Sequence, residues 1–260
     1  MQKQLIKTLS QLVNETGLAE ADAVLIHGDA IIAHAYVGPG VSKLEAVKHF
    51  LSDLLKALNP NTFVFFPSFT YKFTITGVFD LTESEGEVGL LSEVFMDHYS
   101  KTRTIDPIFS HCCNRNDVDL RSRVFTSAFG DKSFYNYILN RFINLKILNL
   151  GCSFERNTFC HHIEKHASVP YRFDKIFNGE ILAEDDTLKI DYSYFCRDLD
   201  SSSASNFQKL RKELLADSNT HELHFNRIGF NVYDAHQFFE VGLNLLNVDK
   251  LSLLEEANDI

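Results

Sequence analysis

The chain has 260 residues, of which 45% are hydrophobic and 23% are charged, and this composition excludes a disordered chain. Its formal net charge of -10 repels phosphate backbones and argues against nucleic acid as a partner. The five cysteines include no CxxC pair, which indicates reduced thiols, and no apolar run approaches the roughly 20 residues that span a bilayer. We therefore expect a single cytoplasmic domain over residues 1–260, without a membrane segment.

The first 70 residues predict two helix–strand pairs. Apolar residues at helical spacing before Gly17 indicate a helix, and the short apolar run Asp22–Gly28 indicates a buried strand. Ser42 then begins a second helix, because it is followed three residues later by a glutamate in the pattern of a capping box. Residues 61–71 predict the next strand. This order favours a parallel sheet covered by helices.

The rest of the chain alternates less regularly. Helical periodicity marks residues 88–100, 157–166, 204–217 and 234–247, and extended patterns mark residues 145–153, 171–182 and 186–197. A polar loop is expected at residues 198–206. We predict a three-layer α/β/α fold with a central mixed, largely parallel sheet and a small antiparallel addition in the C-terminal half.

The ten residues Asn157–His166 contain three histidines, a cysteine and a glutamate. In a helix, His161 and Glu164 are three residues apart and His162 and His166 are four apart, so each pair can share a face. This stretch therefore contains the candidate reactive residues. Three functional interpretations of these residues compete with a purely structural one.

Two of these interpretations fit the sequence poorly. A zinc site would combine residues from two parts of the chain (His111, Cys112, Cys113, Cys160 and His162), but their separations match no zinc-binding spacing. A Cys160 nucleophile would need a contacting base, and adjacent helix residues point about 100° apart. We interpret Cys160 and His166 as structural, and His162 is left undecided.

The third interpretation is a general base at position 161. The strand at residues 145–153 brings the chain to the carboxyl edge of the sheet, where α/β proteins bind ligands. A histidine side chain, with an unperturbed pKa of about 6.5, can take a proton from an amine at physiological pH. Glu164 and Glu93 are the acids that could orient His161. The structural alternative, a hydrogen-bonded histidine on a helix surface, stays open at this point.

Several segments, in order, resemble the aminoglycoside 3-N-acetyltransferase family. "NTFCHHIE" is similar to the family's Asn-Thr-x-x-His-x-x-Glu, and "LIHGD" to its Val-His-Ser-Ser. "NTFVFFPSFTY", "FDLTESEGEVGLLSEVF", "RTIDPIFS" and "LKILNLGCS" resemble further family segments, from about Leu5 to Arg172. The resemblance is collinear, and its order and spacing make it more specific than any one motif.

The resemblance implies transfer of an acetyl group from acetyl-CoA to an amino group of an amino sugar, without a metal. It matches His161 to the catalytic base, and Glu93 and Glu164 to acids near it. It also matches eight residues to the cofactor site: His27, Gly28, Asp29, Ser68, Phe69, Thr70, Arg103 and Ser110. Backbone N–H groups of these loops are candidates for holding the thioester oxyanion.

The chain departs from the family pattern at informative positions. Gly28-Asp29 replaces Ser-Ser, and Asp106 replaces a histidine. The acceptor is either an aminoglycoside or a nucleotide-linked amino sugar of surface polysaccharide synthesis, and a homodimer is one allowed assembly. The alternative functions are a family member that binds CoA or a sugar without catalysis, and a metal-dependent hydrolase.

Overall fold

The computed structural model describes residues 4–5, 7–183, 186–198, 204–216 and 220–254. The main sheet has eight strands, in the spatial order β1 (Gln4–Leu5), β10 (His221–Phe225), β11 (Ile228–Asp234), β7 (Leu145–Leu150), β2 (Ala23–Gly28), β3 (Phe63–Pro67), β6 (His111–Cys113) and β5 (Thr102–Arg103). Among these strands, β7, β2 and β3 pair in parallel, as do β1 and β10, and the other neighbours are antiparallel. The predicted mixed sheet is confirmed, with its parallel pairing concentrated at the centre.

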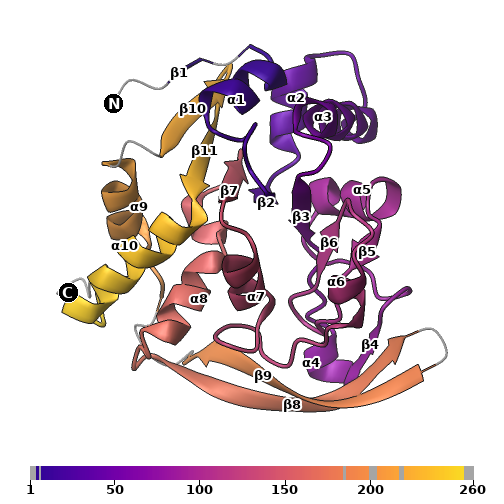
Figure 1. Ribbon diagram of the computed structural model, residues 1–260, viewed down its shortest axis with the longest axis vertical. Coiled ribbons are helices and arrows are strands. Elements are labelled where there is room, and N and C mark those ends of the chain that lie inside the picture. The colour runs from indigo at the N-terminus through magenta and orange to yellow at the C-terminus, as the bar shows by residue number, and fades with distance from the viewer. Residues whose placement is uncertain (1–3, 6, 184–185, 199–203, 217–219, 255–260) are drawn as a thin grey trace.

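Helices cover both faces of this sheet (Figure 1). One face carries α1 (Leu9–Glu15), α2 (Ile31–Val37), α3 (Lys43–Ala57) and α5 (Leu90–His98). The other carries α7 (Phe134–Arg141), α8 (Phe159–His166), α9 (Gln208–Leu215) and α10 (Ala235–Val248). The shorter α4 (Phe73–Thr76), α6 (Val118–Ser122) and the 3-10 turn Phe154–Arg156 lie in connections. The predicted three-layer α/β/α fold is confirmed.

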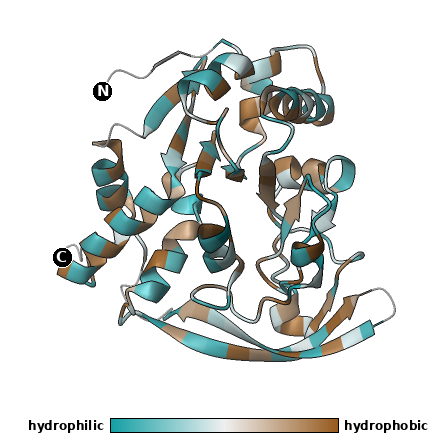
Figure 2. Cartoon of the chain, in the orientation of Figure 1, coloured by the Kyte–Doolittle hydropathy of each residue, from teal (hydrophilic) through white to brown (hydrophobic). Residues whose placement is uncertain are grey.

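The central strands are apolar on both sides because both of their faces are covered. On β2, Val24 and Ile26 pack with the helices of the first face, whereas Ala23 and Leu25 pack with those of the second, and all four are fully buried. Figure 2 accordingly shows β3 in the colours of hydrophobic residues. This explains why the sequence shows continuous apolar runs rather than alternation in these strands.

Helix α3 begins as the sequence predicts. The Ser42 side chain accepts a hydrogen bond from the Glu45 backbone N–H at 3.2 Å, which satisfies one of the unpaired donors of the first turn. Phe50, Leu51 and Leu54 face the sheet and are fully buried. The helix therefore holds the first face through a single apolar stripe.

A second sheet has the order β4 (Val78–Asp80), β8 (Arg172–Ala183) and β9 (Asp186–Arg197). Strands β8 and β9 form a long antiparallel hairpin that runs beneath the main body (Figure 1). Ile181, Ile190 and Tyr192 attach it to the core that contains α7 and α8. The predicted antiparallel addition in the C-terminal half is confirmed, and most of the predicted polar loop at 198–206 lies outside the described residues.

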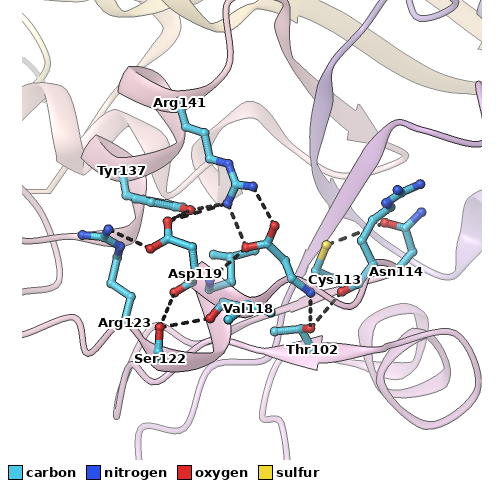
Figure 3. Close-up of polar contacts among 12 residues, drawn as sticks. Thr102, Cys113, Asn114, Val118, Asp119, Ser122, Arg123, Tyr137 and Arg141 are labelled. Atoms are coloured by element: carbon cyan, nitrogen blue, oxygen red, sulfur yellow. Dashed lines mark hydrogen bonds and ion pairs between the residues drawn. The ribbon is translucent and has the colours of Figure 1, made fainter.

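A polar network joins α6 to α7 (Figure 3). Arg141 pairs with Asp117 through two contacts of 2.6 and 2.9 Å. Tyr137 donates to Asp119 at 2.5 Å, and Arg123 pairs with the same carboxylate at 3.0 Å. The hydrogen bond from Arg141 lowers the pKa of Asp117, which keeps this carboxylate ionised. The network fixes α7, which packs beside α8 (Figure 1).

Among the described helices, none combines the length and apolar composition that crossing a bilayer requires.

Candidate active site

Strand β7 ends at Leu150, at the carboxyl edge of the main sheet, and the chain passes through the 3-10 turn before α8 begins at Phe159. Asn157 is fully buried and connects the two elements. Its Nδ2 donates to Asn149 Oδ1 on β7 at 3.3 Å, and its Oδ1 accepts from the Phe159 N–H of α8 at 3.1 Å. The Asn157 side chain thus links β7 to the first residue of α8 through hydrogen bonds at both ends of its amide group. This places His161 in the first turn of α8.

His161 and Glu164 form the pair that their spacing predicts. His161 Nδ1 lies 2.7 Å from Glu164 Oε2. The His161 side chain is 22% exposed, whereas that of Glu164 is fully buried. Because a carboxylate accepts hydrogen bonds, it fixes the imidazole with its proton on Nδ1 and leaves Nε2 to accept a proton. This arrangement suits a general base.

Two aromatic rings enclose His161. The rings of Phe129 and Phe207 each lie 5.6 Å from the imidazole, centroid to centroid, in edge-on orientations. Both phenylalanines are buried, and they come from segments far from α8 in the sequence. The ring of the base is therefore held in position from two sides, and no sequence spacing indicated either residue.

His162, left undecided by the sequence, has a structural role. Its Nδ1 accepts a hydrogen bond from the Gly130 N–H at 3.2 Å. Burial lowers its pKa well below the ordinary value, so the ring stays neutral. The contact anchors the loop that carries Phe129, and His162 thereby supports one wall of the His161 site.

Glu164 has two further partners that the sequence did not indicate. Tyr171 donates its hydroxyl to Oε1 at 3.0 Å, and Arg172 Nε lies 2.7 Å from Oε2. Burial raises the pKa of Glu164, but the charge and hydrogen bond of His161, the charge of Arg172 and the Tyr171 hydroxyl outweigh it. The net pKa is lowered, so Glu164 is a carboxylate at neutral pH.

The cysteines do not support the alternative chemistries. Burial raises the pKa of the Cys160 thiol well above its ordinary value, which disfavours the nucleophilic thiolate. Within the described residues, no group of three or more histidine, cysteine, aspartate or glutamate side chains gathers to hold a metal ion. Cys112, Cys113 and Cys160 are buried as unpaired thiols. They behave as small apolar residues of the core.

The loop after β2 lies beside the end of β7. His27 pairs in register with Asn149 and is buried, and burial lowers its pKa to about 4, so it is neutral. Asp29 is partly exposed, and its Oδ1 accepts from the Ile31 N–H at 3.0 Å. Of the three residues of this loop that the resemblance matches to the cofactor site, Asp29 is the one that presents a charged side chain at this edge.

The loop after β3 is tied internally. Ser68 and Ser110 hydroxyls are 2.9 Å apart, and Arg103 donates to the Ser110 hydroxyl at 3.2 Å and to the Ser68 carbonyl at 3.0 Å. Thr70 and Phe69 are buried next to them. The structure thus brings these residues together, with their polar groups engaged by one another.

Three of the candidate oxyanion donors are already occupied. The backbone N–H groups of Asp29, Ser68 and Thr70 donate to carbonyls of Leu150, Ser110 and Ile108 at 2.8–2.9 Å. These bonds hold the loops in place. The expectation that these N–H groups stabilise the oxyanion is therefore not supported for these three residues.

The model of the aminoglycoside 3-N-acetyltransferase family matches residues 44–247. The chain belongs to this family. The expected enzyme class, an N-acetyltransferase that uses acetyl-CoA, is confirmed at the level of the family.

Solved structures of similar fold include AAC(3)-Xa, with a TM-score of 0.75 and 18% identity over 94% of this chain and 92% of that one. AAC-IIIb, solved with CoASH, has a TM-score of 0.73 and 18% identity over 92% and 95%. AAC-VIa, solved with sisomicin, has a TM-score of 0.73 and 17% identity over 92% and 96%. Comparison with the curated proteins finds no match.

Packing accounts for the glycine that replaces the first serine of the family's Ser-Ser. A Cβ atom at Gly28 would lie 2.6 Å from Leu91 Cδ2 and 3.2 Å from Leu150 Cβ. The Leu91 side chain of α5 therefore occupies the space that a Cβ atom at position 28 would take, and it would have to move to admit one. The packing of α5 in this chain thus explains why position 28 is a glycine rather than the family's serine.

We expect the family-like change Gly28→Ser to lower the free energy of unfolding by about 1–3 kcal/mol, as overpacking does. Urea unfolding of wild type, Gly28→Ser, Leu91→Ala and the double variant measures this, and the double variant should lose less than the sum of the two single losses. Strictly additive losses, or a Gly28→Ser protein as stable as wild type, would show that the Leu91 side chain does not exclude a side chain at position 28.

The second departure, Asp106, is a fully buried carboxyl group. Its Oδ1 accepts from the Tyr192 hydroxyl at 2.7 Å and from the Phe109 N–H at 2.7 Å. Burial raises its pKa to about 7, against the effect of these hydrogen bonds. In this position Asp106 ties β9 to the loop before β6.

Glu93 belongs to α5, which covers the opposite face of the main sheet from α8, the helix of the His161–Glu164 pair. It is exposed in the first turn of α5, and none of the hydrogen bonds among the described residues joins its side chain to His161. Glu164 occupies the orienting position instead. Glu93 stays a predicted site residue on the strength of the family resemblance.

A cavity of about 430 Å³ opens at the same edge of the sheet. Ile31, Cys152, Gln208 and Arg227 are among its lining residues. Gln208 directly follows Phe207, which contacts His161. A larger cavity, about 750 Å³, is lined by residues of α5, β5 and α6 and by none of α8, so size alone does not locate the chemistry.

Proposed function

We propose that this protein transfers the acetyl group of acetyl-CoA to an amino group of an aminoglycoside, with His161 as general base. The observation that carries the proposal is the His161–Glu164 pair, at 2.7 Å, in the first turn of a helix at the carboxyl edge of the sheet. The AAC-IIIb structure with CoASH and the AAC-VIa structure with sisomicin, both of similar fold, support the two substrates.

The proposed reaction is a direct transfer. The amine nitrogen attacks the thioester carbonyl carbon, and His161 Nε2 takes the proton that the nitrogen loses. The C–S bond of the tetrahedral intermediate then breaks, and the leaving sulfur takes a proton from the imidazolium. The products are an amide and CoASH, and the imidazole returns to its neutral form. Glu164 stabilises the imidazolium between the two proton transfers.

The acetyl-CoA arm is proposed to approach along the loop after β2. This loop and the 430 Å³ cavity share the carboxyl edge with α8, and Ile31 and Cys152 belong to the lining. Open α/β sheets bind ligands in the crevice at this edge. The net charge of -10 favours the approach of a cationic acceptor such as an aminoglycoside.

The intact base and its acid favour a catalyst over a family member that only binds. The proposed compartment is the cytoplasm, because all five cysteines are unpaired thiols, as in a reducing environment. Assembly as a homodimer also stays a proposal, and size-exclusion chromatography with light scattering tests it.

Release of CoASH, read with a thiol reagent, tests the proposed reaction. We expect the purified protein to release CoASH from acetyl-CoA when sisomicin is present and to form one acetyl amide per CoASH, seen by mass spectrometry. A nucleotide-linked amino sugar serves as the second acceptor. Turnover of that sugar alone would move the function to polysaccharide synthesis, and saturable acetyl-CoA binding without turnover of either acceptor would overturn the catalytic proposal.

A further inference from the structure

Glu164 is held by residues from two parts of the chain. His161 contacts it from the same helix, whereas Tyr171 and Arg172 reach it from the segment that enters β8. One carboxylate oxygen, Oε2, lies 2.7 Å from both His161 Nδ1 and Arg172 Nε. The base and the guanidinium therefore share a single oxygen of a fully buried carboxylate.

Arg172 is nearly as enclosed as the acid it pairs with. Its side chain is 7% exposed, and that of Glu164 is fully buried. A buried carboxylate needs a counter-charge, because transfer out of water disfavours its ionised form. The other groups facing Glu164 are the Tyr171 hydroxyl and the neutral Cys160 thiol, so Arg172 is the permanent cation among them.

This pairing has a consequence for the base. With Arg172 present, Glu164 has a counter-ion whether or not His161 carries a second proton. Without Arg172, the imidazolium would be the only charged partner of the carboxylate, and the protonated form of His161 would be favoured. A protonated imidazole cannot accept the proton of the amine.

Arg172 also holds the second aromatic wall. Its Nη2 donates to the Ser205 hydroxyl at 3.0 Å, and Ser205 lies two residues before Phe207. The Phe207 ring lies 5.6 Å from that of His161, centroid to centroid. One guanidinium therefore connects the acid, the entry to β8 and the segment that covers the base.

We propose that Arg172 is a positioning residue for the transfer, which keeps His161 available as a base at neutral pH by supplying the counter-charge of Glu164. Tyr171 supports the same carboxylate through its other oxygen. The proposal rests on the proposed function, and it adds a residue that acts through Glu164 rather than on the substrates.

The pH profile of kcat/KM for acetyl-CoA and sisomicin tests this role. We expect Arg172→Gln to move the acidic limb upward by about one pH unit, the lower end of the effect of a nearby charge. On that limb such a shift is about a tenfold loss of kcat/KM. Arg172→Lys keeps the positive charge but loses the planar guanidinium group. The acidic limb of this variant should lie close to the pH at which it lies in wild type.

Two further variants separate charge from packing. Ser205→Ala removes only the contact to the Phe207 segment and should leave the acidic limb in place. Arg197 lies opposite Arg172 in the register of the β8–β9 hairpin and is exposed. Arg197→Gln therefore also removes one positive charge, but from a position that does not contact Glu164. Circular dichroism at the assay temperature confirms that each variant is folded.

A profile of Arg172→Gln that lies below that of wild type by the same factor at every pH would overturn the proposal, as would an equal shift in Arg197→Gln. If the wild type does not turn over sisomicin, the proposed function fails separately. The imidazole NMR titration of His161, assigned by its absence in His161→Ala, then decides. An upward move of its midpoint in Arg172→Gln supports the role of Arg172, and an unchanged midpoint overturns it.

Discussion

The His161→Ala variant is expected to lose about 10²–10⁴-fold in kcat/KM for acetyl transfer, which is the range that a general base contributes. Nδ1 of the imidazole is hydrogen-bonded to Glu164, so Nε2 is the atom that takes the proton of the amine. The substitution by alanine removes this acceptor. The loss should appear in kcat at saturating acetyl-CoA and sisomicin, because the imidazole takes its proton as the amine attacks. The release of CoASH measures it.

Folding and cofactor binding provide the controls for this variant. The His161 side chain is partly exposed and lies between two aromatic rings, so its loss leaves the core of the protein intact. Calorimetric binding of CoASH should stay close to that of wild type. His98, exposed at the end of α5, offers a matched His98→Ala variant that should retain turnover. Wild-type turnover in His161→Ala would remove this residue from the mechanism.

Sequence patterns predicted those helices and strands whose formation depends on neighbouring residues in the chain. Ser42 and the glutamate three residues later marked the start of α3, and the continuous apolar runs marked β2, β3 and β7, whose two faces are both covered. The hairpin of β10 and β11 was not predicted. Its strands mix polar and apolar residues, and they exist because β11 pairs with β7, a contact between residues about 80 positions apart.

The candidate site divides in the same way. The contact between His161 and Glu164 follows from helical spacing, so the sequence predicted it. The roles of Tyr171 and Arg172 depend on how the chain turns between α8 and β8, and no periodicity extends across that turn. The hydrogen bond between Ser68 and Ser110 likewise joins residues 42 positions apart, so the resemblance could group them without showing that they bond to each other.

Removal of the acid should affect stability as well as activity. Glu164→Gln leaves the guanidinium of Arg172 buried without its carboxylate, and breaking a buried pair from one side costs about 3–5 kcal/mol. Transfer should also fall, because the amide no longer stabilises the imidazolium. Thermal unfolding measures the first effect, and the release of CoASH at a temperature where the variant is folded measures the second.

The pH dependence of this loss has a definite sign. The pKa of Glu164 in the folded protein is lowered below its ordinary value of 4.5, so its charge stabilises the fold fully above that value and ceases to do so as the pH falls through the lowered pKa. The stability gap between wild type and Glu164→Gln should therefore be widest near pH 7 and narrow below about pH 4. The double variant Glu164→Gln/Arg172→Met removes both charges and should recover part of the stability at pH 7 while transfer stays low. A double variant less stable than Glu164→Gln would mean that Arg172 stabilises the fold through contacts other than this carboxylate.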